Sequence, residues 1–346
     1  MKACIISLAL LPGMAGAQSS REEAWRWCAR RDATIALNAQ LAGCNWIIRS
    51  GQETAESLSG AYFNRGNARA ELWDFVGAIA DFTEAIRLNP EFISAFNNRG
   101  NARADQGDLN GAIADFSEAI RLNPQHVSAF NNRGFTRAQQ GDRAGAITDF
   151  SEAIRLAPQD AGAFNNRGFA RFELGDYAAA INDFTEAIRL EPGYARALTG
   201  RAIARGATGD HAGAIADFDE VLRLDPQNAG AFAARAVASH RLGNTDTARA
   251  DLESATRVAG ARDGWPYAAR AALALLRDDR DAVTLELTQA WLRNPNDSLT
   301  MALLAILQNR QGDVAGASAN AAAARRNWPS IGQFLVGFFG PELVLP

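Results

Sequence analysis

Histidine and cysteine side chains are the residues best suited to metal binding or nucleophilic chemistry, and this sequence has few of either. Its three histidines, His126, His211 and His240, stand far apart. None has a cysteine or carboxylate cluster at the spacing that a metal site needs. Serines occur without the GxSxG turn that exposes a nucleophile, and no glycine-rich phosphate loop follows a strand. We therefore predict no metal site, no cofactor and no enzymatic activity.

Residues 1–17 have the features of a cleavable secretory signal. Lys2 supplies a positive start, residues 3–11 form a short apolar run, and small residues end at Ala17, just before Gln18. The apolar run is too short to cross a bilayer. We therefore expect cleavage after Ala17, a periplasmic or secreted protein, and no integral membrane span once the signal is removed.

Two cysteines remain in the mature chain, Cys28 and Cys44. An oxidising compartment makes a disulfide the expected state of such a pair. Closing a loop of this length would stabilise the fold by about 3 kcal/mol in the chain-entropy model. No CxxC spacing supports a redox enzyme or a zinc site. We predict a Cys28–Cys44 disulfide.

Composition narrows the fold class and the partners. Apolar residues make up 47% and charged residues 21% of the 346 residues, which is typical of a folded protein. Abundant alanine favours helices, because alanine loses the least entropy on entering one. The net charge of −4 provides no basic surface that could release counterions from phosphates. We expect an all-α protein that does not bind nucleic acid.

An internal repeat is the dominant signal of the sequence. Prolines recur every 34 residues at Pro90, Pro124, Pro158, Pro192 and Pro226. Numbering each repeat from residue 59, position 4 is large and apolar, positions 8 and 20 are small, and position 24 is mostly Phe. Small residues let two helices approach closely, and aromatic rings fill the space between them. A Gly-Asp pair is expected to end the first helix of a unit and cap the second.

This pattern resembles the tetratricopeptide repeat, whose unit is a pair of antiparallel helices. The resemblance implies a right-handed superhelical solenoid, because one hairpin cannot bury its apolar face alone. It covers about eight units, from residue 59 to residue 331. The predicted organisation is a signal, a degenerate helical hairpin, six repeats, two divergent repeats and an apolar capping tail. Their limits are 1–17; 18–58; 59–92, 93–126, 127–160, 161–194, 195–228 and 229–262 (together 59–262); 263–331; and 332–346. We expect the tail to cover the open face of the last repeat.

Asparagines are concentrated at positions that, by the same resemblance, face a concave groove. An asparagine side chain offers a donor and an acceptor, so a ladder of them can pair with the backbone of an extended peptide. We expect these side chains to face solvent. The predicted peptide-binding residues are Asn64, Asn67, Asn97, Asn98, Asn101, Asn131, Asn132, Asn165 and Asn166. The alternative is that position 6, often Asn in the family, is merely solvated.

A second ladder is ionic. Position 7 is Arg and position 23 is Asp in all six repeats of the segment 59–262, and Arg also recurs at position 11. We interpret these residues as Arg–Asp pairs that set the register between helices, since the planar guanidinium suits a carboxylate. A stripe of arginines facing an acidic partner is the alternative.

The sequence therefore predicts a non-enzymatic scaffold of the bacterial envelope that binds protein or peptide partners in an asparagine-rich groove. Two alternatives stay open. The degenerate segment 260–297 could form the site of an enzyme or of an enzyme accessory protein. The array could also be a structural spacer that assembles complexes through its convex side.

Overall fold

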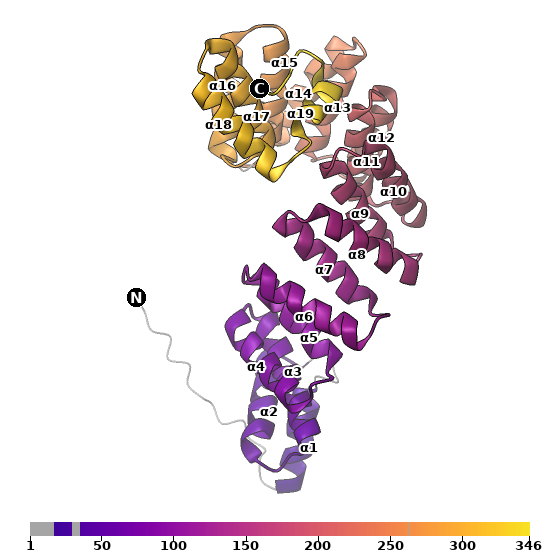
Figure 1. Cartoon of the computed structure of the whole chain (residues 1–346), viewed down its shortest axis with the longest axis vertical. Helices are drawn as coiled ribbons and strands as arrows, with labels where there is room; N and C mark the ends of the chain where they lie inside the picture. The colour runs from indigo at the N-terminus through magenta and orange to yellow at the C-terminus, as the bar shows by residue number, and fades with distance from the viewer. Residues whose placement is uncertain (1–16, 30–34, 262) are drawn as a thin grey trace. The chain divides into compact units, whose positions relative to one another are not determined.

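The computed structural model describes residues 17–29, 35–261 and 263–346, and all regular elements in these ranges are helices (Figure 1). Residues 1–16 of the predicted signal lie outside the described residues. The chain divides within α7 (Val127–Gln140) into two compact units. Unit 1 ends at Thr136 and unit 2 begins at Arg137. The predicted all-α architecture of paired helices is confirmed.

Successive helices pack in pairs within each unit, and each pair stacks on the next. The pairs of unit 1 are α1 (Ala17–Cys28) with α2 (Leu37–Ser50), α3 (Ala55–Glu71) with α4 (Phe75–Leu88), and α5 (Ile93–Asp105) with α6 (Leu109–Leu122). Unit 2 contains α8 (Arg143–Leu156), then the pairs α9 (Ala161–Glu173) with α10 (Tyr177–Leu190), α11 (Ala195–Ala207) with α12 (His211–Leu224), α13 (Ala229–Arg241) with α14 (Thr245–Val258), α15 (Trp265–Leu276) with α16 (Arg280–Arg293), and α17 (Ser298–Gln311) with α18 (Val314–Asn327). A short α19 (Ile331–Phe334) continues into a π-helical turn, η1 (Leu335–Phe339).

The turn within a pair follows from two residue types. Gly107 has a φ of 90°, which reverses the chain after α5, and the Asp108 carboxylate then accepts a hydrogen bond of 2.9 Å from the Gly111 N–H at the start of α6. A left-handed backbone is easy for glycine and strained for other residues. Trp73 and Asp278 nevertheless occupy this turn, with φ values of 63° and 54°.

In the regular pairs, a buried phenylalanine of the second helix faces a small residue of the first helix. Phe116 is only 1% exposed, and a Cβ added at Gly100 would overlap its ring. Phe82 and Phe184 lie in the same way against Gly66 and Gly168. The close approach of the two backbones therefore depends on the small residue, as the repeat pattern predicts.

The ionic ladder joins helices within the pairs. Asp115 is 3% exposed and accepts hydrogen bonds of 2.7 and 2.9 Å from Arg99, and of 2.8 Å from Arg103. Arg99 also donates to Thr83 of the preceding pair at 3.1 Å. The same set recurs in unit 2, where Arg167 and Arg171 bind Asp183. The structural interpretation of these arginines is therefore confirmed.

The first pair carries a disulfide. Cys28 at the end of α1 and Cys44 in α2 are bonded, with a Cα–Cα distance of 4.6 Å, and both are fully buried. This bond agrees with the pairing that the sequence predicts. Across the described ranges, no helix is long and apolar enough to span a membrane.

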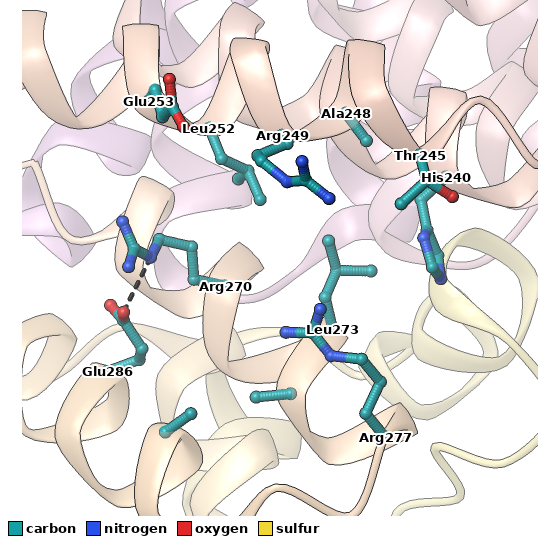
Figure 2. A pocket seen from close by; sticks show the side chains of 12 residues that line it. His240, Thr245, Ala248, Arg249, Leu252, Glu253, Arg270, Leu273, Arg277 and Glu286 are labelled. Atoms are coloured by element: carbon teal, nitrogen blue, oxygen red, sulfur yellow. Dashed lines mark ion pairs between the residues drawn. The ribbon is translucent and has the colours of Figure 1, made fainter.

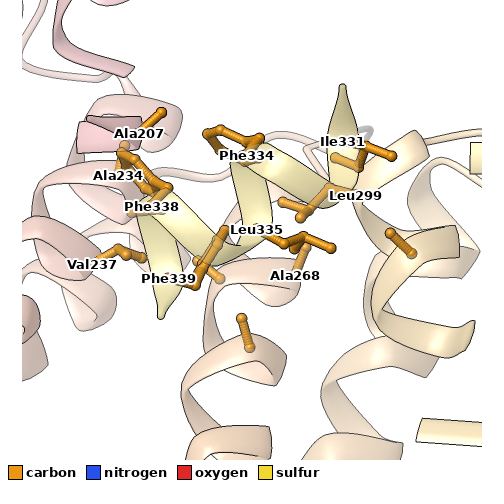
Figure 3. Packing of buried hydrophobic residues seen from close by; sticks show 14 of the residues in the cluster. Ala207, Ala234, Val237, Ala268, Leu299, Ile331, Phe334, Leu335, Phe338 and Phe339 are labelled. Atoms are coloured by element: carbon orange, nitrogen blue, oxygen red, sulfur yellow. The ribbon is translucent and has the colours of Figure 1, made fainter. Parts of the chain in front are cut away.

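The C-terminal tail does not lie where the sequence places it. It touches the last pair through α19, but η1 packs against α11 and α13, far back along the chain. Phe334, Phe338 and Phe339 are fully buried among residues of the first helices of these pairs (Figure 3). The sequence predicts that the tail covers the last repeat alone. The structure differs, because the tail also extends over α11 and α13 of unit 2.

Candidate functional site

The predicted asparagines of unit 1 bind one another. Asn132 donates to Asn97 at 3.1 Å, Asn97 donates to Asn98 at 3.1 Å, and Asn98 donates to Asn67 at 2.8 Å. These bonds connect the first helices of successive pairs, since Asn67 lies in α3, Asn98 in α5 and Asn132 in α7. Amides that are paired in this way have fixed orientations, and each keeps further donor or acceptor capacity.

Three of these amides line an open groove of about 330 Å³ on unit 1, which we call the asparagine groove. Asn67, Asn98 and Asn101 form its polar wall, and two carboxylates, Glu71 and Asp105, stand beside them. Asp105 and Asn101 are exposed. The floor is apolar and includes Phe75 and Phe82. The groove can therefore offer amide hydrogen bonds, a negative charge and an apolar surface to the same ligand.

The remaining predicted asparagines are placed differently. Asn97 is 9% exposed and Asn165 is fully buried, so the expectation that all these side chains face solvent is wrong for these two. Both residues hold position 5 of their repeats, one residue before the half-buried asparagines at position 6. Asn64, Asn131, Asn132 and Asn166 are half-buried, and none lines the asparagine groove.

The amide ladder stops in unit 2. Asn165 donates to Asn166 at 3.3 Å, but its own carboxamide oxygen is buried and accepts no hydrogen bond from a described residue. In unit 1 the equivalent oxygen, that of Asn97, accepts from position 6 of the next pair. That position is Gly200 in the pair after Asn165, so the donor is missing.

Beyond this point the inner face of unit 2 becomes apolar. Position 6 is Ala234 in α13, and position 9 is Ile203 in α11 and Val237 in α13, where unit 1 has asparagines. η1, which carries Phe338 and Phe339, packs on α13, which carries Ala234 and Val237 (Figure 3). The chain's own tail therefore covers part of the surface that could receive a peptide in this half.

Two further contacts tie the end of the chain to the start of unit 2. Arg143 donates to the backbone oxygen of Asn327 at 2.8 Å and pairs with Glu173 at 2.8 Å. The Ser330 hydroxyl donates to the Phe172 carbonyl at 3.3 Å. The last residues therefore cover part of unit 2, and an open pocket of about 440 Å³ remains along α11 and α13, lined among others by Ile203 and Ala234.

A separate pocket of about 260 Å³ lies among α13, α14, α15 and α16 (Figure 2). His240, Arg249, Arg270 and Arg277 line it together with Glu286 and apolar side chains. Arg270 is paired with Glu286 at 2.7 Å. Burial raises the pKa of Glu286, although Arg270 opposes this shift. The residue types resemble no catalytic triad or metal site, but the pocket lies beside the degenerate segment that the sequence singled out.

The histidines share no site. His126 accepts a hydrogen bond of 3.1 Å from the Ala129 N–H, His211 is buried at the start of α12, and only His240 lines the pocket. Within the part of the chain that the structure describes, no group of three or more His, Cys, Asp and Glu side chains could hold a metal ion.

Comparison with known proteins identifies the repeat. Sequence profiles described as "TPR repeat" match residues 100–141 and 136–175, and those described as "Tetratricopeptide repeat" match residues 59–92, 165–229 and 199–264. Together they span more than half of the 346 residues. The chain belongs to the tetratricopeptide repeat family. The family implies that the array is a scaffold for protein partners.

Solved structures share this tetratricopeptide fold. A tetratricopeptide repeat protein from Parabacteroides merdae has a TM-score of 0.62 and 20% identity, over 72% of this chain and 99% of its own. The APC/C hetero-tetramer Cut9–Hcn1 has a TM-score of 0.54 and 18% identity, over 78% and 52%. YrrB, described as having an unusual peptide-binding site, has a TM-score of 0.47 and 22% identity, over 51% and 91%. At these identities the likeness shows the fold alone. No curated protein matches the sequence.

The sequence reasoning missed two features of these surfaces. Glu71 and Asp105 both occupy position 13 of their repeats, so their shared period was a usable signal. The replacement of groove asparagines by Gly200 and Ala234 was a signal that the inner face of unit 2 changes character. Neither feature is visible when the asparagines are considered alone.

Proposed function

We propose that this protein is a non-enzymatic scaffold of the bacterial envelope that binds an extended segment of another protein in the asparagine groove of unit 1. The observation that carries the proposal is the convergence of Asn67, Asn98 and Asn101 on one open groove that has two carboxylates at its edge. We infer that the bound segment carries a lysine or arginine opposite Asp105 and Glu71.

The amides suit an extended backbone. A peptide strand presents N–H and C=O groups along both edges, and an asparagine can pair with either. Because Asn98 is already oriented by its bond to Asn67, less side-chain entropy is lost when a ligand binds. The apolar floor at Phe75 and Phe82 would receive one side chain of the peptide.

The contrast between the two units supports this choice of surface. In unit 2, α11 and α13 carry apolar residues or glycine at the positions of the groove asparagines, and η1 with Phe338 and Phe339 packs on both helices. In unit 1 the groove is open and Asn101 is exposed. A partner segment therefore needs to displace nothing in unit 1.

The proposed location rests on two features. The segment 1–17 has the pattern of a cleavable signal, and the Cys28–Cys44 disulfide is of a kind that persists in oxidising compartments. Intact mass spectrometry of protein purified from the producing cell tests both. Cleavage after Ala17 and no alkylatable thiol are expected, whereas a retained leader or two free thiols would place the protein elsewhere.

The binding experiment uses short fluorescent peptides with a central arginine, and matched peptides in which glutamine or glutamate replaces it. Fluorescence anisotropy should show tighter binding of the arginine peptides. Asp105→Asn should weaken that binding about three- to tenfold, because one partly exposed charged hydrogen bond is lost. Glu91→Gln, an exposed acidic residue outside the groove, is the matched control and should bind normally.

A second variant tests the amides. Asn98→Ala combined with Asn101→Ala removes two groove side chains and should lower affinity by at least tenfold if their contributions add. The melting temperature is measured in parallel, because Asn98 also bonds to Asn67. Equal affinity of the arginine and glutamate peptides, or unchanged binding by the double variant at normal stability, would exclude the asparagine groove as the binding surface.

A further inference from the structure

The pair α13–α14 departs from the other pairs where its two helices meet. Position 21 of the five earlier repeats is an isoleucine, and these residues are Ile79, Ile113, Ile147, Ile181 and Ile215. The sixth repeat has Arg249 at this position. Position 12 changes in the same pair, from Ala70 in α3 to His240 in α13. In unit 1, Ala70 and Ile79 pack together in a small apolar cluster, so the change replaces an apolar contact with two basic side chains.

Both changed residues line the pocket of Figure 2. Arg249 reaches into it from α14, and Arg277, the residue that directly follows α15, reaches into it as well. Thr245 and His240 form one end of the pocket, and Arg270 with Glu286 the other. Leu252 and Leu273 are among the apolar residues of its wall.

The charges of the lining residues leave an excess of positive charge. Arg270 is neutralised by Glu286 at 2.7 Å. Arg249 has only a loose contact with Asp246, at 3.6 Å, between two exposed side chains. Arg277 forms no ion pair with any residue in the described ranges. Three arginines against Glu286 and Glu253 therefore leave a single uncompensated charge on the wall.

The pKa of His240 is shifted in the direction that an excess of positive charge in the pocket would cause. Burial lowers the pKa of His240, and the positive charges of Arg277 and then Arg241 lower it further. The imidazole thus lies within reach of the same positive field. A neutral imidazole adds hydrogen-bonding capacity to the pocket without adding charge.

We propose that this pocket binds a carboxylate carried on a short apolar group, held by Arg249 and Arg277 with its apolar part against Leu252 and Leu273. A guanidinium binds a carboxylate through two parallel hydrogen bonds. One excess positive charge matches a monoanion, and the glutamates on the wall disfavour a dianion such as phosphate. The volume of about 260 Å³ suits a small group and not a long chain. This site goes beyond the peptide groove of unit 1.

The carboxylate could belong to a free organic acid or to the C-terminus of a peptide, and two probes separate these sources. Isothermal titration calorimetry of the purified protein is performed with isovalerate and with acetyl-Gly-Leu. The uncharged amides of both compounds and inorganic phosphate serve as comparison ligands. We expect at least one carboxylate probe to bind, with its amide and phosphate binding at least tenfold more weakly.

Two variants connect binding to the pocket. Arg249→Ile restores the residue that the five earlier pairs carry at this position, so it should fold, and it should weaken binding at least tenfold. Arg277→Gln should weaken binding to the same degree. It is a second test of the pocket, in case Arg249→Ile changes the local structure. Arg87→Gln, on the surface of unit 1, is the control and should leave binding unchanged. No binding of either probe, equal binding of phosphate, or unchanged affinity in both pocket variants would overturn the proposal.

Discussion

The contact between the tail and α11 allows a double-mutant test of how the tail packs on unit 2. Phe338 is fully buried, and its ring lies against Gly206 so closely that an added Cβ at Gly206 would overlap it. Phe338→Ala should lower the free energy of unfolding by about 3–5 kcal/mol, as expected for a large-to-small change in a packed core. Gly206→Ala alone should lower it by about 1–3 kcal/mol through overpacking.

The two changes should not add. Once the Phe338 ring is removed, the extra methyl group at Gly206 has room, and alanine is favoured over glycine inside a helix by roughly 0.5–1 kcal/mol. Gly206→Ala should therefore become neutral or stabilising in the Phe338→Ala background. The coupling free energy should be about 2 kcal/mol or more, which is typical of residues in direct contact.

Chemical denaturation followed by circular dichroism gives the four free energies of unfolding. Val336→Ala serves as the control in the tail, since Val336 is 37% exposed and should contribute much less. Additive effects of Phe338→Ala and Gly206→Ala would refute the packing of the tail on the inner face. A Phe338→Ala effect no larger than that of Val336→Ala would refute it as well.

Three further predictions concern single sites. Burial lowers the pKa of His211, so the unfolded state takes up a proton near its ordinary value of about 6.5 before the folded state does. The free energy of unfolding should therefore fall as the pH drops below that value, and His211→Phe should reduce this loss between pH 7 and 5. A pH profile of the melting temperature that is unchanged in the variant would contradict this role of His211. Trp73 is 80% exposed with a φ of 63°, so Trp73→Gly should raise stability by about 1 kcal/mol in a thermal melt, and a lower melting temperature would argue against strain at this turn. Asp115→Asn leaves two arginines without their buried carboxylate and should cost about 3–5 kcal/mol in denaturant titrations. Glu118→Gln at a solvent-exposed pair should change the stability little, and similar losses in the two variants would contradict the buried role of Asp115.

Much of the fold was predictable because it depends on local residue types that recur at one period. Gly107 and Asp108 determine a turn through backbone freedom and a capping carboxylate, and neighbouring residues suffice for that. Arg99 and Asp115 were also correctly paired, since opposite charges at matching positions of two packed helices leave few other arrangements. These interactions repeat in each pair, so the period alone reveals them.

The parts that were not predictable depend on contacts between distant segments. Nothing in the local pattern of Phe338 indicates that its ring lies on Gly206, more than a hundred residues earlier in the chain. The burial of Asn165 depends on which face of α9 meets the neighbouring helices, and a difference of one position along the helix decides it. The pocket at Arg249 forms only when residues of α13, α14, α15 and α16 come together, so its net charge cannot be read from any one of these helices.

The central claim is that a partner segment binds unit 1 and not the face of unit 2 on which the tail packs. Site-specific photocrosslinking tests it most directly. A benzophenone amino acid replaces either Asn101, in the asparagine groove, or Val336, on the partly exposed side of the tail, and each protein is irradiated with the arginine peptide. The account predicts a crosslinked adduct from position 101 that unlabelled peptide competes away, and none from position 336. An adduct from position 336 without one from position 101 would contradict it.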